Sequence, residues 1–153
     1  MKIMTWIKRA RLGAGSYLLF MSFLMLIWSG LTLFLCQHYA LTGNMTLKQL
    51  VTSLSLMGSC VGLLFYPLSA RRLRDLNFPG WSVHVLAFPL FAVIFLPVLC
   101  FLSGPRWDND YGEPPPASGF VKRLVALIAF FLAMLQTREA LIVFYQTRYA
   151  LSN

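Results

Sequence analysis

Two long stretches of this chain, residues 16–36 and 50–70, contain no charged side chain, and each has 21 residues. At about 1.5 Å per residue, a helix of that length reaches roughly 31 Å, the thickness of the hydrocarbon core of a bilayer. Two further apolar stretches cover residues 81–103 and 124–145. The sequence therefore predicts an all-α polytopic membrane protein, a bundle of four transmembrane helices.

The composition excludes the soluble protein classes. Residues of the set AVILMFWYC make up 58% of the chain and charged residues 12%, against about 45–50% and about 25% in soluble domains. So few charges cannot make a whole protein surface polar, and the remaining apolar surface would drive aggregation in water. We therefore expect lipid to surround most of the outer side chains.

The net charge of +8 indicates contact with anionic lipid headgroups rather than with nucleic acid. The basic residues lie just outside the apolar stretches, where they orient helices and meet the membrane surface. The three cysteines lie inside apolar stretches, without the spacing of a zinc site or a disulfide framework; they are Cys36, Cys60 and Cys100. We expect no metal, no other cofactor and no nucleic-acid partner.

Lysine and arginine set the expected orientation, because they favour the cytoplasmic side of the membrane. Four basic residues precede the first stretch and three follow the second, whereas the loop of residues 37–49 has one, Lys48. The N-terminus is therefore predicted to be cytoplasmic and this loop external. The seven basic residues are Lys2, Lys8, Arg9, Arg11, Arg71, Arg72 and Arg74.

The course of residues 81–103 has two alternatives, because Pro89 and Pro97 interrupt it. Proline kinks a helix, although membrane helices tolerate it where neighbours satisfy the freed carbonyl. The third helix is either proline-kinked and fully crossing, or a re-entrant hairpin that returns the proline-rich loop 104–120 to the cytoplasm. We expect a full crossing, because about 21 residues are few for two legs and a turn across most of a bilayer.

The segment 70–81 has the densest charge in the chain. It fits a positive anchor at the cytoplasmic surface with Trp81 in the aromatic belt. It also fits a binding site for a lipid headgroup or a partner protein, because arginine binds phosphate with two parallel hydrogen bonds and Asp75 can hold Arg71 one helical turn away. The candidate binding residues are Arg71, Arg72, Arg74, Asp75, Trp81 and His84.

Two other features of the apolar stretches are candidates for contacts between helices. Gly58 and Gly62 form a GxxxG motif, which brings another backbone close, either inside the bundle or in a homodimer. Arg138 and Glu139 interrupt the fourth stretch. They mark the end of a shorter span, followed by an amphipathic tail of residues 140–149, or they pair with groups inside the bundle.

Three segments together resemble a known family. The segment Ala70-Arg71-Arg72-Leu73-Arg74-Asp75 is followed by Gly80-Trp81, and Asn109-Asp110-Tyr111-Gly112 is followed by Pro114, Pro115 and Pro116. Both are similar to segments of the bacterial inner-membrane family catalogued as domain of unknown function 805, with Arg74 where the family has His. Of the family's opening stretch, Arg11 and Tyr17 are kept, and Ala14 and Ser16 stand where Arg and Glu would.

The resemblance implies a multi-pass protein of the bacterial inner membrane and assigns no activity. It divides the chain into a family-like membrane domain, residues 1–120, and an additional fourth span with a C-terminal tail, residues 121–153. The family-like domain holds spans 16–36, 50–70 and 81–103 and the proline-rich loop with Asn109, Tyr111 and Gly112.

No catalytic motif occurs in the sequence, neither HExxH, nor GxSxG, nor a phosphate-cradling glycine loop. We therefore expect no enzymatic activity. The expected function is that of an interaction, accessory or immunity-type membrane protein that binds another membrane protein or a second copy of itself. The alternative is an anionic-lipid-binding protein or a small transporter that uses the cluster of Arg71, Arg72 and Arg74.

Overall fold

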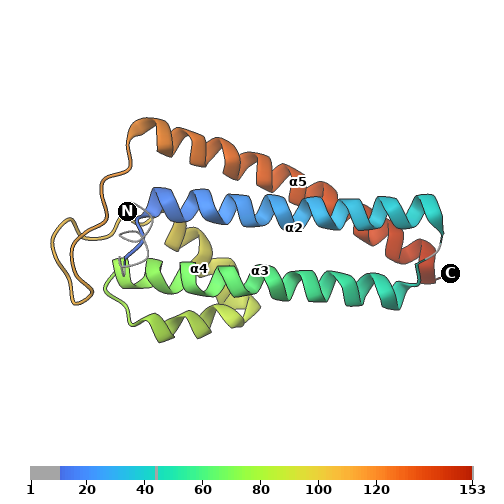
Figure 1. Cartoon of the computed structure of the whole chain (residues 1–153), viewed down its shortest axis with the longest axis horizontal. Helices are drawn as coiled ribbons and strands as arrows, with labels where there is room; N and C mark the ends of the chain where they lie inside the picture. The colour runs from blue at the N-terminus through green and yellow to red at the C-terminus, as the bar shows by residue number, and fades with distance from the viewer. Residues whose placement is uncertain (1–10, 44, 153) are drawn as a thin grey trace, which may run out of the picture.

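The computed structural model describes residues 11–43 and 45–152, so Lys2, Lys8 and Arg9 lie outside the described part of the chain. Three long helices run the length of the molecule, α2 (Ala14–Thr42), α3 (Leu47–Asp75) and α5 (Phe120–Ser152) (Figure 1). Each contains a segment long and apolar enough to cross a membrane. The described residues contain no strand, only one bridge between Asn109 and Gly112. The all-helical membrane architecture is confirmed.

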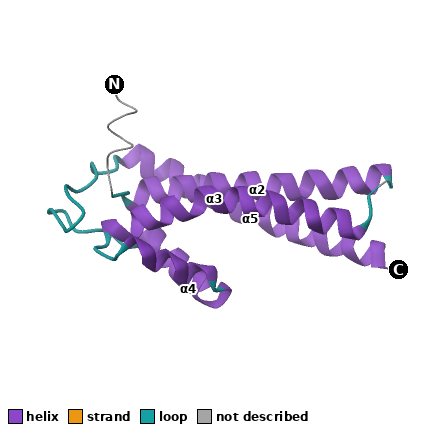
Figure 2. Ribbon diagram, turned by 60° about the horizontal axis from the view of Figure 1, so that its bottom comes forward, coloured by secondary structure: helices purple, strands orange, loops and turns teal. Residues whose placement is uncertain are grey.

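The expected third span, residues 81–103, is not one straight helix. Residues 80–101 form a bent pair, η1 (Gly80–Ala87) and α4 (Pro89–Phe101), with 115° between the two axes. Both ends of the pair lie at the last turn of α3, because Gly80 packs against Arg74 and the Leu102 carbonyl accepts a hydrogen bond from Arg72. Figure 2 shows α4 leaving the bundle at this end. The prediction of four spans is therefore not confirmed, and the pair has the shape of the re-entrant alternative.

The break between η1 and α4 has a local cause in the sequence. Phe88 has an extended backbone, with φ −86° and ψ 118°, because a residue before proline avoids the helical region. Pro89 then starts α4 at a position where its missing N–H is not needed. The legs of 8 and 13 residues reach only about 16 Å and 20 Å. Each leg is shorter than the roughly 30 Å hydrocarbon core, so neither leg is long enough to cross a bilayer by itself.

The two ends of α3 are set by local residues. Thr46 and Gln49 form a capping box at its start, in which each side chain accepts a hydrogen bond from the other residue's backbone N–H. At its end Asn77 has a φ of 63°, the left-handed conformation that commonly terminates helices and that asparagine tolerates. The chain therefore turns directly after Asp75 and leaves that carboxylate on the final turn.

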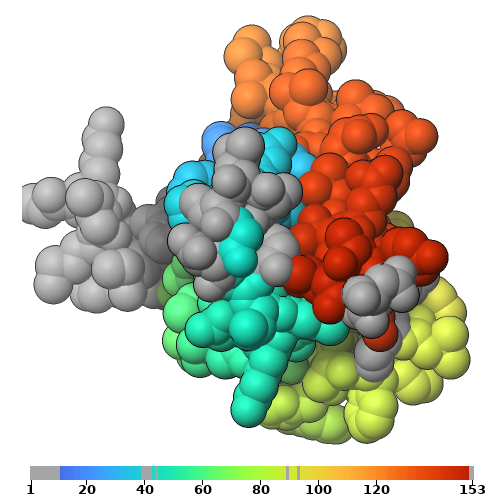
Figure 3. Space-filling view, turned by 90° about the vertical axis from the view of Figure 1, so that its right-hand side faces the viewer, coloured from blue at the N-terminus to red at the C-terminus, as the bar shows by residue number. Residues whose placement is uncertain are grey.

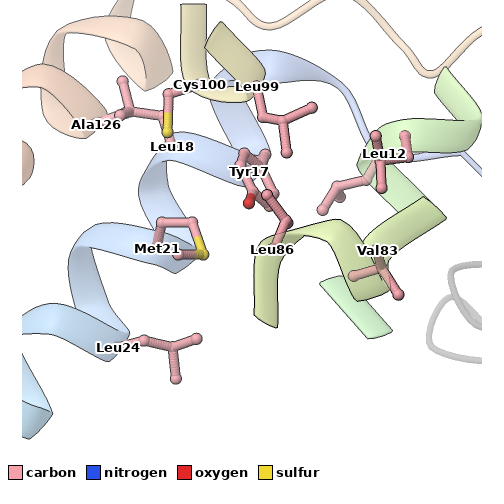
Figure 4. Packing of buried hydrophobic residues seen from close by; sticks show 11 residues of the cluster. Leu12, Tyr17, Leu18, Met21, Leu24, Val83, Leu86, Leu99, Cys100 and Ala126 are labelled. Carbon is pink, nitrogen blue, oxygen red and sulfur yellow. The ribbon is translucent and has the colours of Figure 1, made fainter. Parts of the chain in front are cut away.

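Most buried apolar side chains gather at the end of the bundle where α3 ends. Tyr17 is fully buried there, between residues of α2 and of the η1–α4 pair (Figure 4). The larger cluster includes Leu18, Met21, Leu24, Val83, Leu86, Leu99, Cys100 and Ala126. A smaller cluster of Cys36, Leu50 and Leu54 lies at the opposite end. The hairpin thus completes the core at one end only.

The last helix, α5, is continuous through Arg138 and Glu139. Its ribbon passes that of α2 in the second half of both helices (Figure 1), and its C-terminal part lies beside the start of α3 (Figure 3). The helix therefore does not end at the charged pair, and the expectation that a shorter membrane span ends there stays a prediction. Because α5 runs in the same direction as α2, the loop 104–119 lies at the end where α2 begins, and α5 ends at the other.

Candidate functional site

Asp75 is the centre of a buried polar cluster at the end of α3. Its side chain is paired with two arginines, Arg11 from the segment before α2 and Arg72 from the preceding turn of α3. Arg11 donates from Nε to Oδ1 across 3.1 Å, and Arg72 donates from Nη1 to Oδ2. All three residues are nearly or fully inaccessible, at 3%, 0% and 2% exposure for Arg11, Arg72 and Asp75. The cluster therefore carries a net charge of about +1 inside the protein.

The remaining donors of Arg11 hold the proline-rich loop. Its Nη1 donates to the carbonyls of Trp107 and Gly112 across 3.1 Å and 2.8 Å, and its Nη2 donates to the carbonyl of Pro105 across 2.9 Å. Gly112 has a φ of 101°, a conformation open to glycine and strained for other residues. Arg11 thus joins the start of α2, the end of α3 and loop 104–119.

Arg72 connects the same carboxylate to the returning leg of the hairpin. It donates from Nε to the Leu99 carbonyl across 2.7 Å and from Nη2 to the Leu102 carbonyl. These carbonyls belong to the last turn of α4, where no residue further along the helix supplies an N–H. A third bond runs from Nη1 to the Leu12 carbonyl across 3.3 Å. Arg72 therefore caps α4 from inside the protein.

Two glycines make the close packing around this cluster possible. A Cβ on Gly104 would lie 2.7 Å from both the carboxyl carbon and the backbone oxygen of Asp75, and a Cβ on Gly80 would lie 2.8 Å from the Arg74 Nε. Such distances are shorter than any real Cβ contact. Gly104 is thus required by the backbone and carboxylate of Asp75, whereas a Cβ on Gly80 meets only the end of the flexible Arg74 side chain.

The loop motif packs on the arginine segment. Asn109 donates from Nδ2 to the Arg74 carbonyl and accepts from the Tyr111 N–H, both across 2.9 Å. The Arg74 guanidinium lies over the Tyr111 ring, 5.8 Å from its centre, a cation–π arrangement. The two motifs that the sequence singled out, separated by about 35 residues, are therefore brought into one site.

Other predicted site residues lie elsewhere or have structural roles. Arg72 is occupied inside the fold, so its guanidinium does not face a lipid headgroup. The carboxylate expected beside Arg71 lies instead between Arg11 and Arg72. Trp81 is 71% exposed, and His84 is exposed with its ring 6.3 Å from that of Tyr66. The arginine segment thus mainly holds the hairpin and the loop in place against the end of α3.

The two glycines of the GxxxG motif differ in their surroundings. A Cβ on Gly58 would lie 3.2 Å from the Trp28 ring of α2, whereas a Cβ on Gly62 would meet no atom within 4 Å. Gly58 therefore allows close packing inside the bundle, and Gly62 faces open space.

Sequence reasoning missed the part that Arg11 plays, and it missed a second contact nearby. Tyr17 shares a hydrogen bond of 2.9 Å with the buried hydroxyl of Ser69 on α3. Arg11 and Tyr17 are the two residues kept from the family's opening stretch. That match was the one signal in the sequence that pointed to them.

A second polar feature lies on the outer face of α5. Arg138 and Glu139 are 3.2 Å apart and their side chains are 71% and 57% exposed. Gln136, two residues earlier, donates to the Leu26 carbonyl of α2 across 3.4 Å. Leu26 is about 18 Å along α2 from its first residue, near the middle of that helix. The charged pair therefore faces outward at mid-bundle, not into the interior.

A family model described as "Protein of unknown function (DUF805)" matches residues 7–113, which include the whole Arg11–Arg72–Asp75 cluster and the loop motif. The matched range excludes α5. The chain matches no curated protein and no solved structure.

Proposed function

This chain belongs to the DUF805 family, proteins of unknown function, and from that premise we propose that it is an accessory protein of the bacterial inner membrane that binds another membrane-spanning chain through α5. The observation that carries the proposal is the outward-facing pair Arg138 and Glu139 at mid-bundle. A charged residue at the centre of a membrane helix costs about 2.5–3.5 kcal/mol, and such residues normally face protein or water. A partner helix that covers the pair removes this contact with lipid.

The neighbours of the pair support a helix-sized interface. Residues three, four and seven positions from Arg138 lie on the same face of α5. Those positions are exposed and apolar; they are Phe131, Met134, Leu135, Leu141, Ile142 and Tyr145. Adjacent positive and negative charges within an apolar stripe favour a partner helix with complementary polar groups at the same depth.

A polar group near the depth of this ion pair has no hydrogen-bond partner among the described residues. The Thr137 hydroxyl is buried and makes no hydrogen bond within the described residues. It lines a cavity of about 400 Å³ between α2, α3 and α5, with Trp28, Gly58 and Ala140 among the other walls. A polar side chain from a partner that enters this cavity would satisfy the hydroxyl.

The orientation proposed for the protein follows from its two ends. The described basic residues at the end where α2 begins are Arg11, Arg71, Arg72, Arg74, Arg106, Lys122 and Arg123, against Lys48 and Arg148 at the other end. Positively charged residues favour the cytoplasmic side. We place the N-terminus and loop 104–119 in the cytoplasm and the end of α5 outside.

Site-specific photocrosslinking in intact cells tests the proposed partner. A photoreactive amino acid at Leu135 or Ile142, on the stripe, is expected to give a discrete adduct with another protein. The same amino acid at Leu63, an apolar residue of α3 with 76% exposure, is the matched control and is expected to give none. The adduct is expected to disappear when Arg138→Gln and Glu139→Gln are combined.

Two outcomes contradict the accessory role. If Leu135 and Ile142 capture only lipid, α5 binds no protein. If the adduct has twice the mass of the chain, the stripe joins two copies of this protein instead of a different partner.

A further inference from the structure

The end of the molecule that carries the arginines contains a cavity of about 680 Å³. Its walls are the first turn of α2, the end of α4, the proline-rich loop and the start of α5. Leu18, Phe101 and Leu127 form an apolar part, and Ser103 and Ser118 add hydroxyl groups. A volume of this size is in the range of pockets that hold small organic ligands, about 300–1,000 Å³.

Two arginines line this cavity without an internal partner. The side chains of Arg106 and Arg123 are exposed and make no hydrogen bond or ion pair with any other residue of 11–43 and 45–152. The carboxylate of Asp75 also reaches the wall, but Arg11 and Arg72 more than neutralise it. The acidic loop residues Asp108, Asp110 and Glu113 do not line the cavity. The fixed charge around the space is therefore strongly positive.

The start of α2 adds backbone donors to the same wall. Gly13, Ala14 and Gly15 line the cavity, and the first intrahelical bonds begin only with the N–H groups of Ser16 and Tyr17, which donate to the Gly13 carbonyl. N–H groups of a first helical turn point outward and favour an anion. Together with two arginine forks, they suit the several oxygens of a phosphate group.

We propose that this cavity binds a phosphate group, presented either by an anionic phospholipid or by a free phosphate compound. The cationic wall takes the phosphate oxygens, and the apolar wall of Leu18, Phe101 and Leu127 takes the adjoining carbon chain. This site uses none of the residues of the α5 stripe, so it stands independently of the proposed accessory role.

Native mass spectrometry of the full chain in a neutral detergent, with added phosphatidylglycerol, tests the site. The wild type is expected to retain phosphatidylglycerol, and the double variant Arg106→Gln, Arg123→Gln is expected to retain it at least about tenfold less. The matched control is Lys48→Gln with Arg148→Gln, which removes the same charge from two exposed residues at the opposite end and is expected to bind as the wild type does.

A competition with inorganic phosphate separates the two sources of the phosphate group. Displacement of phosphatidylglycerol by millimolar phosphate supports a site for free phosphate compounds, and retention supports a lipid headgroup site. Equal binding by the Arg106/Arg123 variant and the Lys48/Arg148 control would overturn the proposal, because the attraction would then depend on net charge or on the apolar surface alone.

Discussion

Arg11, which lies just before α2, donates to the carboxylate of Asp75, the last residue of α3, across 3.1 Å. This contact joins residues that are 64 positions apart in the chain. Because Arg11 also holds three carbonyls of loop 104–119 and Asp75 also binds Arg72, a change at this one ion pair reaches the start of α2, the end of α3, the loop and the end of α4.

Replacing Asp75 by Asn is expected to lower the free energy of unfolding by about 3–5 kcal/mol, because two buried guanidinium groups lose their counter-charge. Chemical unfolding of the purified protein in detergent measures the loss. Asp108→Asn removes an exposed carboxylate and is expected to change the value by no more than about 0.5 kcal/mol. Equal stability of the two variants would show that the buried pair contributes nothing.

Replacing Gly104 by Ala is expected to destabilise the protein by about 1–3 kcal/mol, because the new methyl group overlaps Asp75 and the site is closely packed. Gly119→Ala is the control, since a Cβ at that position meets no atom within 4 Å. The melting temperatures of the two variants in the same detergent give the comparison. A Gly104 variant as stable as the Gly119 variant would mean that the loop packs less closely on Asp75.

Reporter fusions decide the course of the hairpin. A reporter after Gly112 is expected to lie in the cytoplasm and a reporter after the last residue outside, because residues 80–101 return to the end at which they start. Paired fluorescent-protein and alkaline-phosphatase fusions measure this. The opposite pattern, an external loop and a cytoplasmic C-terminus, would require a full crossing by residues 81–103.

Leucine substitutions at the two glycines of α3 are expected to act differently. Gly58→Leu pushes against the Trp28 ring and should cost about 1–3 kcal/mol, whereas Gly62→Leu adds a side chain to open space and should be close to neutral. Thermal unfolding in detergent compares them. A larger loss at Gly62 than at Gly58 would indicate that Gly62 packs against another chain.

The long helices could be predicted from the sequence because their signal is local. The uncharged stretches 16–36 and 50–70 lie within α2 and α3, and residues 124–145 lie within α5. Hydrocarbon thickness alone requires such lengths. The same local criterion preferred a full crossing for residues 81–103. It counts apolar residues and takes no account of which residues hold the two ends of the segment. Those ends are fixed by Arg74 and Arg72, and composition does not show such long-range bonds.

Sequence patterns identify the residues of the candidate site more accurately than they describe the role of each residue. The segment 70–75 and the motif of Asn109 and Tyr111 were both singled out, and the structure brings them together. A surface role for Arg72 was predicted because three nearby arginines at a membrane surface normally face headgroups. Its burial depends on Asp75, Leu99 and Leu102, and the last two contacts are through backbone carbonyls that no side-chain pattern reveals.

The short hairpin gives the protein unequal width in the two leaflets. Five helical segments, α2, α3, η1, α4 and α5, lie at the arginine end of the molecule, and only α2, α3 and α5 continue to the other end. A wedge of this shape displaces more lipid from one leaflet than from the other. We therefore expect the protein to accumulate in curved bilayers. Its distribution between small and large vesicles would reveal that preference.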